Sequence, residues 1–244
     1  MALKAKRVEL KKGKGKLVSP LLDTDNYPAR VVQVIDLGLQ ANKFDKGETH
    51  NRLMLTYELT DEFCLDEAGE KLLDKPRWFS EEINVIDLPE DMDLQDIYTD
   101  QYRGKAKMVI RARAFDPKGV HDFDFSLYLK CPCAVTIIQK KKKDGTIKND
   151  IGNVTAPMRG LVVPELVNEP KFFSLDEPDL EVFKSLPDWL QEKIKENLEF
   201  NGSPLQKLLG IPYKEPEPEE EEEEDGAQGT DGGDEKDEGE DAPW

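Results

Sequence analysis

Residues Lys140 to Lys143 are four consecutive lysines that stand directly before Asp144-Gly145, a pair typical of a tight hairpin turn. Like charges this close repel one another unless an anion relieves them, so a hairpin that carries them predicts contact with phosphate groups. The alternative is that the run is only a solvated face, as most charge runs are. The candidate phosphate contacts here are Lys140, Lys141, Lys142, Lys143 and, on the return side of the turn, Lys148.

Residues 215–244 carry the opposite charge. They hold sixteen Asp and Glu residues against one Lys, which is about −15 of the formal net charge of −18. Because like charges at this density repel and almost no apolar side chain is present to bury, we expect this acidic tail to be disordered. One role for a tail of this kind is simply to keep the protein soluble.

The last residues of the tail favour a second role, because a solubilising segment has no use for an indole ring. An aromatic residue after acids and proline can enter an apolar pocket of a partner while the carboxylates meet a basic rim. The candidate partner-binding residues are Glu240, Asp241, Pro243 and Trp244. The same acidic string could also fold back on a basic groove of its own protein and compete with a polyanion.

Residues 1–20 form a basic arm with seven Lys and Arg residues against Glu9, a net charge of about +6. Interleaved Gly13 and Gly15 make a helix unfavourable, and the segment lacks the Gly-Lys-Ser/Thr ending of a phosphate-binding loop. A flexible basic arm suits a phosphate backbone or the acidic tail, and a solvated terminus is the alternative.

Other classes of function find little support in the residues. The chain has no nucleotide-binding loop and no spacing of nucleophile and base, so we expect neither an enzyme nor a cofactor. Cys131-Pro-Cys133 is spaced too tightly for a zinc pair, so we expect no metal. Three cysteines, no long apolar run and no signal peptide predict a soluble protein with free thiols that stays in the cytoplasm.

Five segments have the pattern of β-strands. Residues 52–59 alternate strictly, with Leu53, Leu55, Tyr57 and Leu59 on one face, which predicts a strand with one buried and one open face. The other expected strands are residues 27–38, 76–86, 133–139 and 147–154. Residues 105–115 place Met108, Ala112 and Phe115 on one side, as a short helix would.

This order predicts a mainly β fold, a five-stranded OB-like (oligonucleotide-binding) Greek-key barrel with a short helix between strands 3 and 4. From Pro164 the pattern changes to a proline-punctuated linker and one or two short helices broken at Pro187. The expected organisation is a basic arm (1–20), an OB-like domain (21–163), a linker and helical extension (164–214) and the acidic tail (215–244).

Barrels of this kind bind single strands across their second and third strands, with cations for phosphates and aromatic rings for base stacking. The candidate DNA-binding residues from the strands and loops, besides the lysines of the hairpin, are Arg30, Lys43, Arg52, Tyr57, Arg77 and Trp78. Tyr57 shares a face with Leu53 and Leu55, so a core role is the alternative for it. Trp78 and Phe79 point to opposite faces, and Trp78 is the preferred stacking residue because a buried indole N–H needs a partner.

Three sets of residues carry a resemblance to bacteriophage single-stranded DNA-binding proteins, which combine an OB-like core with an acidic tail ending in an aromatic residue. They are Met1 to Val8 with Asn26 to Val32, Lys75-Pro-Arg-Trp78, and Val167-Asn-Glu-Pro170 with Leu186 to Lys193. The bacterial relatives end in Pro-Phe after aspartates, whereas this chain ends Asp241-Ala-Pro-Trp244.

The resemblance implies a non-catalytic protein that coats single-stranded DNA with little sequence preference in the cytoplasm of a bacterial host, as a monomer or a homo-oligomer. It also implies that the tail recruits replication and recombination proteins, such as polymerase, helicase or primase, and recombinase, and that it competes with DNA. The alternative is an interaction or assembly protein whose acidic tail mimics nucleic acid and whose barrel is only a scaffold. Basic residues concentrated in an arm and a hairpin favour DNA binding, because a pure mimic would not need them.

Overall fold

The computed structural model describes residues 17–42 and 47–214. Most of the basic arm and the acidic tail lie outside the described residues, so the expectations for them stay predictions. The chain divides into two compact units, Met1–Tyr213 and Lys214–Trp244, and the fold below is that of the first unit.

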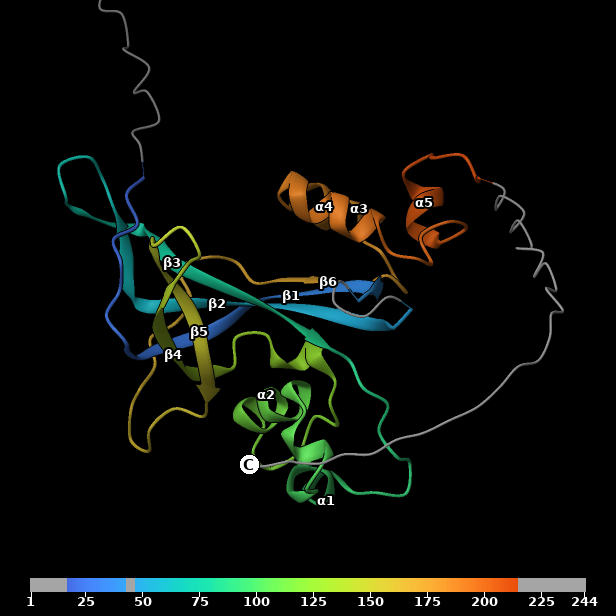
Figure 1. The fold of residues 1–244 in the computed structure, drawn as a ribbon, viewed down its shortest axis with the longest axis horizontal. Helices are drawn as coiled ribbons and strands as arrows, with labels where there is room; N and C mark the ends of the chain where they lie inside the picture. The colour runs from blue at the N-terminus through green and yellow to red at the C-terminus, as the bar shows by residue number, and fades with distance from the viewer. Residues whose placement is uncertain (1–16, 43–46, 215–244) are drawn as a thin grey trace, which may run out of the picture. The chain divides into compact units, whose positions relative to one another are not determined.

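In the described residues, five antiparallel strands form one curled sheet that makes about half a barrel (Figure 1). Their order across the sheet is β3-β2-β1-β4-β5, and a short strand, β6, pairs with β1 in parallel. The strands are β1 (Asp25–Ala41), β2 (Thr49–Leu65), β3 (Lys71–Asn84), β4 (Pro132–Lys141), β5 (Ile147–Thr155) and β6 (Lys171–Phe173). The mainly β class predicted from the alternating segments is confirmed.

Strand β1 is long and bent, and it pairs with β2, β4 and β6. Its register against β2 shifts between Val31 and Gln33 and again between Asp36 and Gly38, and bulges of this kind bend a strand and increase its twist. Residues 25–30 of β1 pair with β4, and residues 33–35 pair with β6. At the second shift Gly38 has a φ of +67°, and a Cβ there would clash with the side chains of Asn197 and Leu175.

Short helices fill the connection between β3 and β4. They are α1 (Leu94–Thr99), the 3₁₀ helix η1 (Arg103–Lys105), α2 (Lys107–Phe115) and the 3₁₀ helix η2 (Phe125–Tyr128). Helix α2 buries Met108, Ala112 and Phe115, and it contacts β3, β4 and β5. The Phe115 ring lies 6.2 Å from that of Tyr57 and 5.5 Å from that of Tyr128, so α2 helps to fill the hollow of the half barrel.

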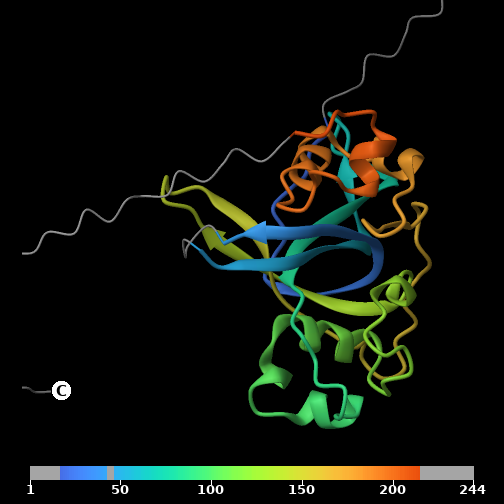
Figure 2. The same ribbon diagram turned by 90° about the vertical axis from the view of Figure 1, so that its right-hand side faces the viewer.

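The other face of the sheet is covered by residues 171–209, with helices α3 (Leu180–Lys184), α4 (Asp188–Lys195) and α5 (Pro204–Leu208). Figures 1 and 2 show α3 to α5 on one side of the sheet and α1 and α2 on the other. The second core that results contains Ile35, Leu37, Met54, Phe173, Phe183, Leu186, Leu190, Ile194 and Leu205.

This second core corrects the prediction that β2 has an open face. Met54, Thr56 and Glu58 are 3%, 1% and 0% exposed, although they lie on the face opposite to Leu55 and Tyr57. Both faces of β2 are therefore buried, because the chain beyond residue 163 returns and packs on the outer one.

Candidate nucleic-acid interface

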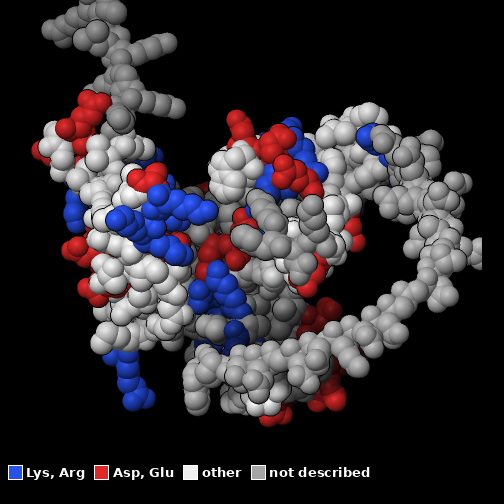
Figure 3. Space-filling model, in the orientation of Figure 1, with Lys and Arg blue, Asp and Glu red and all other residues white. Residues whose placement is uncertain are grey.

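The lysine run occupies the β4–β5 hairpin. The turn is closed by a hydrogen bond from Lys142 N to Thr146 O (2.8 Å), and Gly145 supplies a φ of +88°. Asp144 accepts hydrogen bonds from the backbone N–H and the hydroxyl of Thr146, which holds the pKa of Asp144 below its ordinary value. The sequence and the turn together project the lysines into solvent, and Figure 3 shows basic side chains gathered over this hairpin.

Two of these lysines have an anionic partner. Lys140 and Lys148 face each other in the register of the hairpin, and their Nζ atoms lie 3.1 Å and 3.6 Å from Asp150 Oδ2. Partial burial would raise the pKa of Asp150, but the hydrogen bond and charge of Lys140 and the charge of Lys148 lower it instead. Within the described residues, Lys141, Lys142 and Lys143 are exposed and make no ion pair. These three lysines are available to an external anion.

Trp78 is the aromatic residue of the predicted set that reaches the surface. Its side chain lies on β3 and is 39% exposed, while its Nε1–H donates to Glu58 Oε2 at 2.9 Å. Phe79 lies on the opposite face of β3, beneath Arg77, and packs against the core that fills the hollow of the half barrel, which includes Tyr57, Phe115 and Tyr128. Between these two rings, the structure leaves Trp78 as the one that a base could stack on.

The structure gives Tyr57 and Arg77 internal roles, which corrects the roles expected from sequence. Tyr57 is fully buried, and its hydroxyl donates to Glu81 Oε1 at 2.7 Å. Burial, followed by the negative charge of Glu81, raises the pKa of Tyr57 well above its ordinary value. Arg77 is 8% exposed, donates to Pro20 O at 2.6 Å and lies 5.5 Å over the Phe79 ring. Neither side chain can meet a ligand in this conformation.

Arg30 also makes its hydrogen bonds within the protein. Its guanidinium donates to the backbone oxygens of Lys130, Val163 and Pro164 at 2.6 to 2.9 Å and to the carboxylate of Glu165 at 2.8 Å. These bonds fasten residues 163–165 to β1. The expected phosphate contact is therefore replaced by a structural one.

Arg52 lies at the edge of a cluster of charges between β2, β3 and α4. Its Nη1 is 3.7 Å from Glu82 Oε2, and Lys193 from α4 pairs with the other oxygen of the same carboxylate. The Arg52 side chain is 14% exposed, so it contributes less to the surface than the lysines of the hairpin do. Lys43, Glu240, Asp241, Pro243 and Trp244 lie outside the described residues.

The sequence analysis did not single out a pair of cations on α2, which the structure uses to neutralise Glu81. Lys107 Nζ lies 2.8 Å from Glu81, and Arg111 makes two bonds of 2.6 and 3.0 Å to the same carboxylate. Burial by itself would raise the pKa of Glu81, but the hydrogen bonds and positive charge of Arg111 outweigh it, so the pKa of Glu81 is lowered. The sequence contains an indication of this pair, because Lys107 and Arg111 are four residues apart in a segment expected to be a helix and therefore lie on one face of it. Figure 3 shows basic side chains in the middle of this view, where Figure 1 places α2.

Strand β3 contacts β5 across the open side of the half barrel, and β5 is the return strand of the lysine hairpin. A stacking ring and a row of cations are the two kinds of group that single strands require, because bases present flat faces and the backbone presents phosphates.

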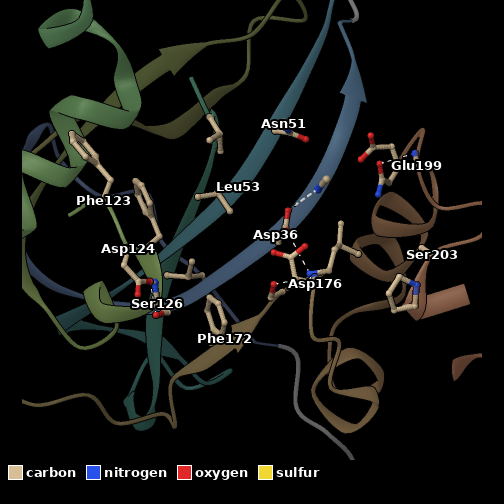
Figure 4. A pocket seen from close by; sticks show the side chains of 18 residues that line it. Asp36, Asn51, Leu53, Phe123, Asp124, Ser126, Phe172, Asp176, Glu199 and Ser203 are labelled. Atoms are coloured by element: carbon tan, nitrogen blue, oxygen red, sulfur yellow. Dashed lines mark hydrogen bonds between the residues drawn. The ribbon is translucent and has the colours of Figure 1, made fainter. Parts of the chain in front are cut away.

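A pocket of about 610 Å³ lies elsewhere, between β1, the loop before η2 and the segments after β6 and α4. Figure 4 shows the side chains of Asp36 and Asp176 in it, with Phe123 and Phe172 among its walls. Asp36 accepts from Gly38 N and Leu175 N at 2.8 and 3.2 Å, and burial raises its pKa. The pocket is lined by carboxylates, and no Lys or Arg is among the described residues around it, so it is unsuited to a polyanion.

No family model, curated protein or solved structure matches this chain. In residues 17–42 and 47–214, no helix has the length and apolarity to cross a membrane. The same residues contain no cluster of three or more His, Cys, Asp or Glu side chains arranged as metal ligands. The candidate interface therefore rests on the described residues alone, namely the exposed lysines of the β4–β5 hairpin and the exposed indole of Trp78 on β3.

Proposed function

We propose that this chain is a non-catalytic protein that binds single-stranded DNA with little sequence preference. The observation that carries the proposal is the β4–β5 hairpin, whose exposed lysines at positions 141–143 have no ion pair within the described residues. The exposed indole of Trp78 on β3 adds a surface on which a base can stack. Point charges on flexible stems suit phosphates in any sequence, and an indole stacks on any base.

The fold is consistent with an OB-like barrel, which we propose as its identity. The strand order β3-β2-β1-β4-β5 and a helical segment between β3 and β4 support it. In such barrels the hairpin between the last two strands borders the binding groove, and here it carries the lysines.

We further propose that the acidic tail serves partners and regulation. Its carboxylates complement the charge of the hairpin, so it competes with DNA, and Glu240, Asp241, Pro243 and Trp244 recruit replication and recombination proteins. Polymerase, helicase or primase, and recombinase are the partner classes that this role implies, in the cytoplasm of a bacterial host.

The test is to replace Lys141, Lys142 and Lys143 together by Gln and to measure the binding of a labelled oligo-dT by fluorescence anisotropy at several salt concentrations. Each phosphate contact contributes about −0.7 to the log-log salt slope, so loss of three contacts flattens the slope by about 2 and weakens binding. The matched control replaces Lys118, Lys184 and Lys207, which are exposed and lie away from the hairpin. Equal effects of the two triple variants would contradict a binding role for the hairpin and favour a protein whose acidic tail is its functional part.

A further inference from the structure

Glu58 is a fully buried carboxylate on β2. It accepts hydrogen bonds from Trp78 Nε1 (2.9 Å), Val167 N (2.6 Å) and Asn168 Nδ2 (2.7 Å). Within the described part of the chain, no Lys or Arg pairs with it. A buried carboxylate without a cation requires several donors, so these three N–H groups are what permits Glu58 at this position.

The donors come from two separate segments. Trp78 belongs to β3, whereas Val167 and Asn168 belong to residues 163–170, which we call the strap. The strap is also fastened by Arg30, which lies directly opposite Glu58 in the β1–β2 register. A cross-strand pair of opposite charge therefore holds the strap at two points.

We propose that Glu58 is a positioning residue that sets the orientation of the Trp78 ring for base stacking and couples it to the docking of the strap. The inference rests on the proposed function, in which Trp78 stacks on bases. One bond to the indole N–H fixes the ring at its edge and leaves 39% of the side chain exposed. Because the same carboxylate binds the strap, release of the strap and rotation of the ring share one set of hydrogen bonds.

The first part of the test requires no DNA. Trp189→Phe and Trp244→Phe leave Trp78 as the sole tryptophan of the three in the chain. In this background Glu58→Gln presents an N–H₂ group to N–H donors, so at least one donor loses its acceptor. We expect stronger acrylamide quenching of Trp78 and faster hydrogen exchange of the Val167 amide. Glu70→Gln, an exposed residue with the same charge change, is the control and leaves both unchanged.

The second part is a double-mutant cycle on oligo-dT affinity with Glu58→Gln, Trp78→Ala and the combination. If Glu58 acts through Trp78, Glu58→Gln weakens binding about fivefold or more in the parent chain and has no further effect beside Trp78→Ala. An equal loss in both backgrounds, or unchanged quenching, would overturn the inference and leave the DNA-binding proposal standing. If no variant and no parent chain binds oligo-dT, the proposed function fails, while quenching and exchange still decide the role of Glu58.

A second variant covers the case in which Glu58→Gln does not fold. Trp78→Phe keeps an aromatic ring but removes the N–H, so Glu58 loses one donor and the strap is held less firmly. We expect faster exchange of the Val167 amide, which a Trp78 independent of the strap would not produce.

Discussion

At the scale of single residues, three arginines and the lysines of the β4–β5 hairpin have different roles. Arg30, Arg77 and Arg111 are largely buried, and their planar guanidinium groups bind backbone oxygens or carboxylates inside the protein. The lysines of the β4–β5 hairpin extend into solvent on flexible stems. In the proposed function, affinity for single-stranded DNA would therefore depend on lysine charges, which salt screens readily.

Trp78→Ala tests the stacking role. Stacking of a base on an aromatic ring contributes about 1 to 3 kcal/mol, so oligo-dT binding should weaken by that amount, with a smaller change for duplex DNA of equal length. The control is Trp189→Ala, because Trp189 lies on α4 and is 58% exposed. Anisotropy titrations at one salt concentration provide the comparison, and equal losses for both variants would argue against a specific contact at Trp78.

Glu81 is predicted to stabilise the fold in a pH-dependent way. Its pKa is lowered below the ordinary value of 4.5, so its stabilising contribution is complete above that pH and is lost as the pH falls through the lower folded value. Glu81→Gln leaves Arg111 buried without its charge partner and should cost about 3 to 5 kcal/mol at pH 7.

The free energy of unfolding is measured by urea titration at pH 7 and at lower pH values. The proteins compared are the parent chain, Glu81→Gln and Glu70→Gln. The difference between the parent and Glu81→Gln should shrink as the pH falls below 4.5, whereas Glu70→Gln should follow the parent throughout. A difference that stays constant with pH would show that the carboxylate charge is not what stabilises the pair.

At the scale of elements, the second core decides how the sheet is covered. Phe183 from α3 is 2% exposed, and its ring lies 5.7 Å from that of Phe173 in β6. Phe183→Ala should therefore destabilise the protein by about 3 to 5 kcal/mol. Leu198→Ala is the control, since Leu198 is 54% exposed.

Urea unfolding followed by the tryptophan signal and by far-UV circular dichroism tests this prediction. We expect one transition that shifts to lower urea for Phe183→Ala. A separate early transition for residues 164–213, with the sheet unaffected, would mean that this segment is an independent extension.

The elements differ in how far the sequence predicts them. Leu53, Leu55 and Tyr57 alternate along β2, and Asp144-Gly145 marks the turn of the hairpin, so local patterns were enough for the strands. Strand β6 spans only Lys171–Phe173, too short for a period to show. Its pairing with β1 depends on residues far away in the chain.

The candidate site was only partly predictable for the same reason. A run of lysines and an indole are visible in the sequence, and the structure leaves both at the surface. The burial of Arg30 and of Glu58 is not visible there, because the strap that covers them lies more than 100 residues later. For Tyr57 the alternation along β2 already offers the core role that the structure shows, whereas the contact of Arg77 with Pro20, 57 residues earlier, has no local pattern to indicate it.

At the scale of the whole molecule, the acidic tail and the basic groups of the chain are of opposite sign. If the tail competes with DNA, removing residues 215–244 tightens binding, most strongly at low salt, where its charges are least screened. A tail that acts only as a solubilising segment would leave the affinity unchanged at either salt concentration.

The most direct test of DNA binding is the anisotropy of a labelled poly-dT oligonucleotide against the full chain and against residues 1–214, each at low and moderate salt. A duplex of equal length is the control. The account predicts salt-sensitive binding of the single strand by both forms, tighter for residues 1–214 and weaker for the duplex. No binding of poly-dT by either form would contradict it.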